Sequence, residues 1–225
     1  MKKMNTSAWE VDTDDQALLA LAGITTDEAY RTDRLRRADE VRRTCAIQPD
    51  HHGFEIGSGD GTVARLLAAQ CAFLDCADVS VSFLTRAREE CRHASNVAFH
   101  QITSGSLESL AGCRYDFGYS LNVFIHLNPY DILFYLREVR RLLKPGGRFY
   151  FDACTIGDDT RDLFHEHATL YQRDPRNLPG FLSFNHPDLI RAIVADVGLE
   201  VDEAASRIKE HEGWLGFLVR SPAAP

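Results

Sequence analysis

Apolar and polar residues follow two different periods along the chain, and the change between them predicts strands and helices in turn. Short apolar runs bounded by turn residues predict strands at 52–56, 73–77, 97–102, 115–123 and 148–151. Two further runs, Leu199–Ala205 and Trp214–Arg220, have no helical pattern between them. The sequence therefore predicts an α/β fold with a seven-stranded, mostly parallel sheet, helices on both faces and an antiparallel last strand.

Capping residues mark where the predicted helices begin and end. Ser80 can cap a helix whose apolar face follows it, and Asn128-Pro129 opens a strongly amphipathic one. Lys144-Pro145-Gly146-Gly147 ends that helix, and Pro187 opens another. Residues 153–182 show no regular period, so we expect an irregular insert there, and long irregular inserts in compact domains usually have a function.

The N-terminal part of the chain predicts helices without strands. Asp12–Asp15 can cap a helix that begins at Gln16, and Thr25–Glu28 can open a second helix that runs to Thr44. We expect residues 1–45 to be a helical cover and residues 46–225 to be the main part of the same domain. A chain of 225 residues has room for one such domain.

Composition narrows the classes of function. The formal net charge of −8 argues against a nucleic-acid substrate, because phosphate binding favours a basic surface. No apolar run has the length of a membrane span, and no apolar stretch follows Lys2 and Lys3 to form a signal peptide. We therefore expect a cytoplasmic protein without membrane or nucleic-acid partners. We expect reduced cysteines and no metal site, because the six cysteines form no C-x-x-C pair: Cys45, Cys71, Cys76, Cys91, Cys113 and Cys154.

A glycine-rich turn stands at the centre of the pattern. Residues 54–62 read as a strand, a turn with Gly57, Gly59 and Gly61, and the start of a helix. Three alternate glycines indicate a sharp turn on which a ligand lies directly. A dinucleotide turn has the spacing G-x-G-x-x-G, whereas the third glycine here comes one position earlier. Glu55 lies two residues before the first glycine and suits a ligand that carries a positive group.

A second acid follows the next predicted strand. Asp78 comes 19 residues after Gly59, where the carboxyl ends of parallel strands meet. A carboxylate there can accept hydrogen bonds from both hydroxyls of a ribose. The alternative interpretation is a helix-capping aspartate, a role that Ser80 already fills.

Together these motifs resemble those of the class I S-adenosylmethionine-dependent methyltransferases of the small-molecule type, over residues 28–220. The resemblance is carried by four stretches in family order, which are Glu55–Gly61, Ala77–Ser80 with Leu84 and Ala87, Tyr115–Leu127, and Leu142–Gly147. It implies a Rossmann-like fold with S-adenosylmethionine as cofactor and a small-molecule substrate. It implies nothing about oligomeric state.

The resemblance also assigns roles to residues. Gly57, Ser58 and Gly59 would lie against the methionine part of the cofactor, with Glu55 on its ammonium group or holding the loop. Family members often have an aspartate after the third strand, and this chain has Thr103 and Ser104 there instead. The cofactor-binding residues that the resemblance implies are Glu55, Gly57, Ser58, Gly59, Asp78, Val79, Thr103, Ser104, Ser120 and Leu121.

Methyl transfer from a sulfonium is an in-line displacement, so the protein mainly has to align the reacting atoms and exclude water. A base is needed only where the acceptor must lose a proton early. His126 follows the fourth strand and is the candidate catalytic base, although a histidine there can also simply hold the loop. Asn122 and Asp152 lie at strand ends where they can face the acceptor.

Further residues are candidates for the acceptor side. His165 and Tyr171 lie in the 153–182 insert, which we interpret as either a substrate lid or a solvated loop. His165-x-His167 lacks a third ligand and does not predict a metal site. Tyr30 and Trp9 can either cover the bound molecules from the N-terminal side or belong to the core.

The sequence thus predicts a methyltransferase that acts on an oxygen or nitrogen of a small molecule. Three alternatives stay open. The fold can bind the cofactor without transferring a methyl group, it can methylate a protein or peptide tail, or it can be a nicotinamide reductase. The early third glycine argues against the last of these.

Overall fold

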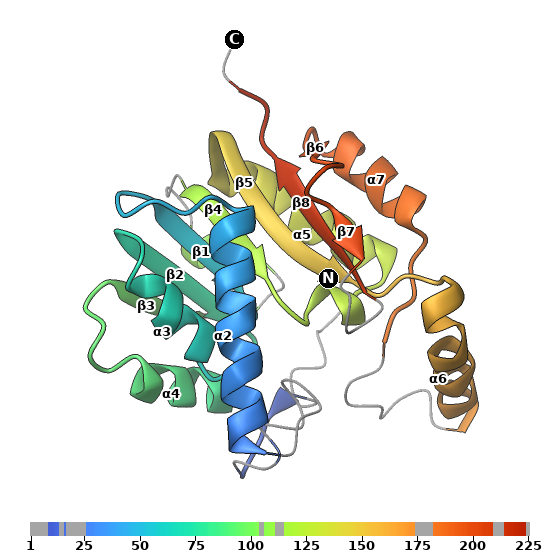
Figure 1. Cartoon of the computed structure of the whole chain (residues 1–225), viewed down its shortest axis with the longest axis horizontal. Coiled ribbons are helices and arrows are strands. Elements are labelled where there is room, and N and C mark those ends of the chain that lie inside the picture. Colours follow the sequence, from blue (N-terminus) through green and yellow to red (C-terminus); the bar gives the residue numbers. More distant parts are fainter. Residues whose placement is uncertain are drawn as a thin grey trace.

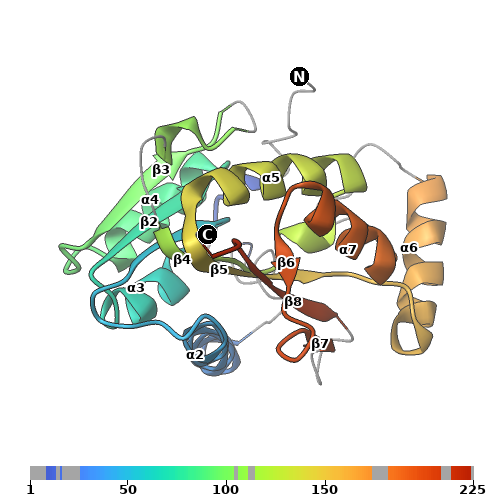
Figure 2. The same ribbon diagram turned by 90° about the horizontal axis from the view of Figure 1, so that it is seen from above.

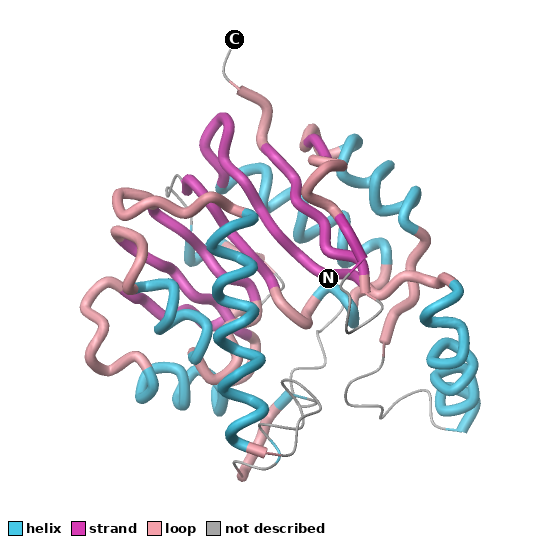
Figure 3. The backbone as a smooth tube through the Cα atoms, viewed as in Figure 1, coloured by secondary structure: helices cyan, strands magenta, loops and turns pink. Residues whose placement is uncertain are grey.

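The computed structural model describes residues 9–13, 16, 26–103, 106–110, 115–173, 182–208 and 214–223. Its strands form one sheet in the order β3-β2-β1-β4-β5-β8-β6 (Figure 3). Their bounds are β1 His52–Ile56, β2 Phe73–Asp78, β3 Val97–Gln101, β4 Tyr115–Ser120, β5 Leu143–Ala153, β6 Glu200–Val201, β7 Arg207–Ile208 and β8 Leu215–Arg220. Strands β1 to β5 are parallel, and β8 is antiparallel to β5 and β6.

This order confirms the predicted seven-stranded, mostly parallel sheet with an antiparallel last strand. The two-residue strand β7 pairs with β8 outside that path, and the sequence pattern did not predict it. Strand β5 begins at Leu143 and so includes the Lys144–Gly147 stretch, which we had expected to be a loop.

Helices cover both faces of the sheet. The helices have the bounds α2 Asp27–Thr44, α3 Thr62–Ala68, α4 Val81–Glu90, α5 Pro129–Leu142, α6 Arg161–Arg173 and α7 Pro187–Asp196, with short 3₁₀ helices η2 Glu108–Leu110, η3 Phe124–His126 and η4 Asp158–Thr160. Helices α2 and α3 lie on one face, and α5 and α7 lie on the other (Figures 1 and 2). Of the predicted N-terminal helices, the second is confirmed as α2, and most of the first lies outside the described residues.

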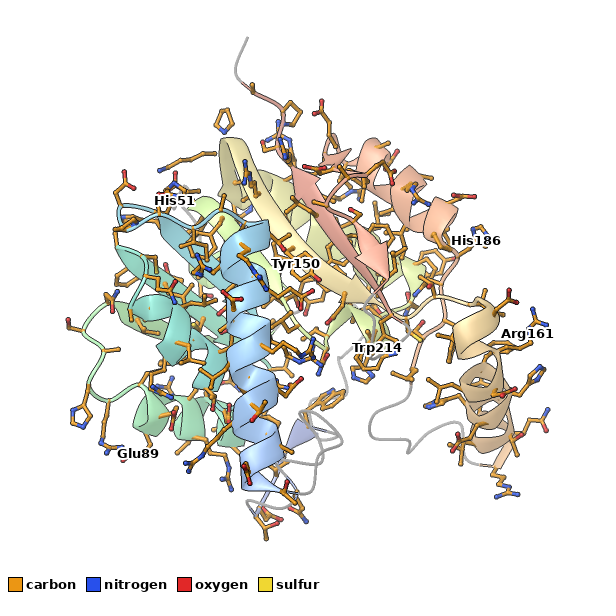
Figure 4. All side chains as sticks on the ribbon, in the orientation of Figure 1. His51, Glu89, Tyr150, Arg161, His186 and Trp214 are labelled. Atoms are coloured by element: carbon orange, nitrogen blue, oxygen red, sulfur yellow. The ribbon has the colours of Figure 1, made fainter. Side chains whose placement is uncertain are left out.

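Alternation along β5 explains how the two faces are filled. Phe149 and Phe151 are fully buried in the core cluster beneath α5 and α7. Tyr150 points to the opposite face (Figure 4), where its hydroxyl donates a hydrogen bond to Glu40 of α2 at 2.5 Å. Successive side chains of a strand point to opposite faces, so one strand helps to fix helices on both sides.

Two predicted capping residues, Ser80 and Asn128, cap their helices as expected, whereas Thr26 at the start of α2 makes no side-chain capping bond. The Ser80 hydroxyl oxygen accepts a hydrogen bond from the Phe83 N–H at 3.1 Å at the start of α4. Asn128 Oδ1 accepts from the Tyr130 N–H at 2.9 Å at the start of α5. Because these caps satisfy N–H groups that have no partner within the helix, they fix where each helix begins.

The expectation of an irregular insert over residues 153–182 is wrong for its central part. Residues 161–173 form the helix α6, preceded by η4. Apolar residues recur at helical spacing in this stretch, at Leu163, Phe164 and Leu170. The pattern of this stretch is thus helical, although none of the helix's side chains is buried in the structure.

The described cysteines Cys45, Cys71, Cys76, Cys91 and Cys154 are buried free thiols, while Cys113 lies outside the described residues. No helix among the described residues combines the length and apolarity that crossing a bilayer requires.

Candidate functional site

The predicted strand, glycine turn and helix lie in sequence at the carboxyl end of β1. Gly57, Gly59 and Gly61 all have positive φ angles, of 80°, 51° and 84°. A Cβ on Gly57 would lie 2.1 Å from Cγ2 of Val123, and a Cβ on Gly61 would lie 2.8 Å from the backbone of Ala87. The turn therefore requires glycine both for its conformation and for its packing.

Asp78 joins this turn to the end of β2. Its Oδ2 accepts a hydrogen bond from the Gly59 N–H at 2.9 Å, and its Oδ1 accepts from the Ser80 N–H at 2.9 Å. The side chain is only 6% exposed, and burial raises the pKa of Asp78 to about 6. Each carboxylate oxygen has a second lone pair, so both can still accept a hydroxyl donor from a ligand.

Glu55 lies beneath the turn and is more deeply buried than Asp78. The side chain is 2% exposed and lies beside Cys76 and Tyr119. Burial raises the pKa of Glu55 to about 8, because it disfavours the charged carboxylate. A cation nearby would favour the ionised form, which makes Glu55 responsive to a positively charged ligand group.

Both acids and the glycine turn line one open cleft with about 960 Å³ of empty space, part of which is open to solvent. Its lining combines the backbone of the turn and the two acids with apolar side chains, among them Val79, Phe83, Ile102 and Tyr135. The cleft therefore suits a ligand that has both charged and apolar groups.

Sequence reasoning missed Arg34, which reaches the cleft from α2. Its side chain is buried against Asp33 and over the ring of Tyr30, at 4.9 Å from the ring centroid. Among the described residues, no acceptor lies within hydrogen-bonding distance of Arg34 Nε or of the Ser58 hydroxyl, which also lines the cleft. Buried polar groups of native proteins nearly always have partners, so these two indicate a polar ligand. From the sequence alone, the arginines of this helix indicated only a solvent-exposed helix face.

Asn122 and Asp152 are brought together, but only one of them reaches the cleft. Asn122 lines the cleft with a left-handed backbone, φ 59°, and its N–H donates to Asp152 Oδ1 at 2.8 Å. Asp152 is fully buried, and its other oxygen lies 3.7 Å from a guanidinium nitrogen of Arg37. The position of Asp152 therefore favours a role in holding Asn122 over direct contact with an acceptor.

His126 lies on η3 at the rim of the same cleft. The centroid of its ring is 4.8 Å from that of Trp9, which also lines the cleft. Tyr30, by contrast, does not line the cleft; its hydroxyl donates a hydrogen bond to Asp60 at 2.8 Å and ties α2 to the glycine turn.

The remaining predicted cofactor residues divide into three groups. Val79 and Leu121 line the cleft. Ser120 is buried behind it, and its hydroxyl donates to the carbonyl of Ile56 at 2.8 Å. Thr103 is exposed and does not line the cleft, and Ser104 lies outside the described residues.

The predicted acceptor residues of the insert lie apart from the cleft. His165 and Tyr171 are exposed on α6, with Tyr171 53% exposed, and neither lines the cleft. His167 of the same helix packs against Phe184 instead. Among the described residues, no group of three or more histidine, cysteine, aspartate or glutamate side chains could hold a metal ion.

Comparison with known proteins finds a matching domain and similar folds. Residues 54–149 match the family model described as a methyltransferase domain. An O-methyltransferase family protein from Burkholderia thailandensis superposes with a TM-score of 0.66 at 16% identity, over 88% of this chain and 59% of that chain. The chain thus spans about three fifths of that protein's length.

Two further solved structures have a similar fold. The magnesium protoporphyrin IX methyltransferase of Synechocystis, solved with bound SAH, has a TM-score of 0.63 at 14% identity, over 88% of this chain and 84% of that chain. The N-methyltransferase NodS of Bradyrhizobium japonicum has a TM-score of 0.60 at 17% identity, over 84% of this chain and 96% of that chain. A methyltransferase domain model thus matches residues 54–149, and the fold is shared with solved methyltransferase structures, one of them with bound SAH.

Proposed function

We propose that the protein transfers a methyl group from S-adenosylmethionine to an oxygen or nitrogen of a small molecule. The observation that carries the cofactor assignment is the bond from the Gly59 N–H to Asp78, because it joins the glycine turn and the second acid in one cleft. Glycine is required at Gly57 by its left-handed backbone and by the close approach of Val123, which fixes the shape of the turn.

The polar residues of the cleft match the polar groups of this cofactor. Asp78 would accept hydrogen bonds from the ribose hydroxyls, and Glu55 would respond to the ammonium group. The free Nε–H of Arg34 and the Ser58 hydroxyl would bind the carboxylate, which is the one anionic group of the molecule. Val79, Ile102 and Phe83 would pack around the adenine.

The bound cofactor supplies an electrophilic methyl group on a sulfonium. The remaining work of the chain is to align an acceptor with that methyl group and to keep water out, and alignment alone can supply about 7–11 kcal/mol. Asn122 is held rigidly at the cleft and would orient the acceptor. His126 would take the proton that a hydroxyl acceptor has to lose.

Two considerations favour a small-molecule acceptor. The acidic net charge of −8 does not suit a nucleic acid. The similar structures include proteins described as an O-methyltransferase family member, a porphyrin methyltransferase and an N-methyltransferase, although their identities with this chain are below 20%. We place the acceptor at the rim of the cleft, near Asn122 and His126. Helix α6, which carries His165 and Tyr171 and lies apart from the cleft, would form an outer wall for a part of the acceptor that extends beyond the cleft.

The test is a transfer assay with S-adenosylmethionine labelled on its methyl group. The protein is incubated with a pool of small hydroxyl and amine metabolites and, separately, with a peptide library. We expect label in the small-molecule pool. Label only in peptides would make the protein a peptide-directed methyltransferase, and cofactor binding without labelling of either pool would leave a binding protein of the same fold.

The assay also separates the roles of His126. His126→Ala should slow transfer to a hydroxyl acceptor while S-adenosylhomocysteine binding is kept, because the residue would act on the acceptor's proton. An unchanged rate would limit His126 to a structural role. Transfer to an amine that is already unprotonated serves as the control, since it needs no early deprotonation.

A further inference from the structure

The N-terminal segment Trp9–Val11 spans the cleft from one wall to the other. Trp9 lies against His126 on η3, on the side that follows β4. Val11 packs against Phe83 of α4, on the side that follows β2. Trp9, His126 and Phe83 all line the cleft, so the segment contacts both of its walls.

Glu10 fixes this segment to the start of α4. Its Oε1 accepts a hydrogen bond from the Val81 N–H at 3.0 Å, and its Oε2 accepts from the Ser82 N–H at 3.0 Å and from the Ser80 hydroxyl at 3.3 Å. The Val11 N–H donates in turn to the Ser82 hydroxyl oxygen at 3.0 Å. Four hydrogen bonds therefore tie Glu10 and Val11 of the N-terminal segment to one helix start.

The helix start is a favourable place for this carboxylate. The first N–H groups of a helix have no partner within it, and a negative charge there is stabilised by the helix dipole. Ser80 already bonds the Phe83 N–H, and Glu10 takes the two N–H groups before it. Partial burial would raise the pKa of Glu10, but the hydrogen bonds from Ser82, Val81 and Ser80 outweigh it and keep that pKa below its ordinary value.

The turn between β2 and α4, to which Glu10 is bonded, also carries the acid that would bind the ribose. Asp78, which would bind the ribose, lies two residues before Ser80 and bonds the Ser80 N–H. Glu10 bonds the Ser80 hydroxyl. The turn between β2 and α4 thus holds the predicted ribose acid on the inside and the N-terminal segment on the outside.

We infer that Glu10 is a positioning residue that holds Trp9 in place as the roof of the cofactor cleft. Its carboxylate acts as a latch on α4, and the bound cofactor or its product leaves only after this latch opens. The inference rests on the proposed function where it concerns the cofactor, but the latch itself concerns only the contacts of Trp9–Val11. Glu10 touches neither the cleft nor the reacting atoms, so its effect on the ligand passes through Trp9.

The two tryptophans of the chain, Trp9 and Trp214, make the latch directly measurable. Trp214→Phe leaves Trp9 as the single tryptophan reporter, and it removes no hydrogen bond within the described residues, because the indole N–H of Trp214 has no partner there. In this background, Glu10→Ala should increase the quenching of Trp9 fluorescence by acrylamide in the absence of any ligand. The reason is that the roof is then released into solvent.

Glu89→Ala is the matched control. Glu89 lies on the same helix, and its substitution by alanine changes the net charge by the same amount. Its side chain projects into solvent (Figure 4) and pairs with Arg92. We expect this variant to leave the quenching of Trp9 unchanged. Glu10→Gln keeps one acceptor oxygen on a side chain of equal length, and it should give an intermediate result. It also carries the test if Glu10→Ala fails to fold.

The second readout is the dissociation rate of S-adenosylhomocysteine, measured by stopped-flow displacement. Loss of a helix-capping carboxylate should speed dissociation about tenfold in Glu10→Ala and leave it unchanged in Glu89→Ala. Equal quenching and equal dissociation rates in the two variants would overturn the latch. If the unmodified chain does not bind S-adenosylhomocysteine at all, the proposed function fails, while the quenching experiment still decides the latch.

Discussion

The glycine turn and helix α6 show two opposite ways of building a region near the same edge of the sheet. The turn has three left-handed glycines, two buried acids and contacts from β1, β2, α4 and the loop after β4. Helix α6 buries none of its side chains and lies at the periphery in both views (Figures 1 and 2). A substitution should therefore have large effects in the first region and small ones in the second.

This difference corresponds to the two ligands of the proposed reaction. The cofactor is the same in every turnover, so its site can be rigid and preorganised. The acceptor differs between related enzymes, and an exposed helix at the periphery can change without disturbing the sheet. We therefore expect cofactor affinity and acceptor choice to be separable by substitution.

The largest effect is expected at Gly57. Gly57→Ala forces a side chain into a left-handed backbone and brings its Cβ to 2.1 Å from Val123, so it should abolish S-adenosylhomocysteine binding and reduce the free energy of unfolding by about 2–4 kcal/mol. The matched control is Gly157→Ala in the segment before α6, where a Cβ meets nothing within 4 Å. Calorimetry and thermal melting of both variants give the comparison, and equal effects would contradict it.

The next effect concerns the charge of Asp78. Asp78→Asn should weaken S-adenosylhomocysteine binding by about 10–100-fold, since hydrogen bonds to a charged group contribute roughly 1.5–3 kcal/mol. Because the pKa of Asp78 is about 6, the affinity of the unmodified protein should rise with pH up to that value and be about tenfold lower at pH 5 than at pH 7. Affinity that varies equally with pH in Asp78→Asn would contradict the assignment.

The raised pKa of Asp78 also affects the stability of the protein without ligand, but in the opposite direction: low pH weakens cofactor binding and stabilises the fold. A carboxyl group whose pKa is higher in the folded than in the unfolded state stabilises the fold while it is protonated. The contribution of Asp78 is therefore present below pH 3.8 and is lost as the pH rises through about 6. Melting curves of the unmodified protein and of Asp78→Asn across this interval should differ in slope in that direction.

A smaller effect is expected at Asn122, whose left-handed backbone favours glycine or asparagine. Asn122→Ala should reduce the free energy of unfolding by about 1 kcal/mol more than Asn122→Gly, because glycine adopts this conformation without strain. Both variants lose the carboxamide, so both should impair transfer to the acceptor. If Asn122→Ala is as stable as Asn122→Gly in urea titrations, backbone strain is not important at this position.

The smallest effect is expected on α6. Tyr171→Ala removes an exposed side chain and should change the free energy of unfolding by less than about 0.5 kcal/mol and leave cofactor affinity unchanged. A raised KM for the acceptor with an unchanged kcat would support α6 as an outer wall of the acceptor site. A loss of cofactor affinity would show that the two regions are not separable.

The glycine turn and the second acid could be recognised in the sequence because their pattern is local. The glycines, Glu55 and Asp78 lie within 24 residues of one another, and each is required by the conformation or the ligand at its own position. The regular strands and the caps at Ser80 and Asn128 could be predicted for the same reason. Both kinds of feature depend on the type and spacing of residues within a short stretch of chain.

The features that were missed depend on contacts between distant segments. Arg34 reaches the cleft from α2, yet in the sequence it is one of several arginines in that stretch. Glu10 is bonded to residues more than 70 positions away, and no local pattern marks it. The burial of Asp152 and its hydrogen bond with the Asn122 N–H likewise depend on the packed sheet. Helix α6 is a different case, since its apolar residues do recur at helical spacing in the sequence.

The central claim is that the acids and the glycine turn bind S-adenosylmethionine, and calorimetric titration of the unmodified protein with S-adenosylhomocysteine tests it most directly. We predict binding of one molecule per chain, a severe loss of affinity in Asp78→Ala, and no binding of nicotinamide dinucleotides. A chain that binds a nicotinamide dinucleotide instead, or that binds S-adenosylhomocysteine equally well without Asp78, would contradict the account.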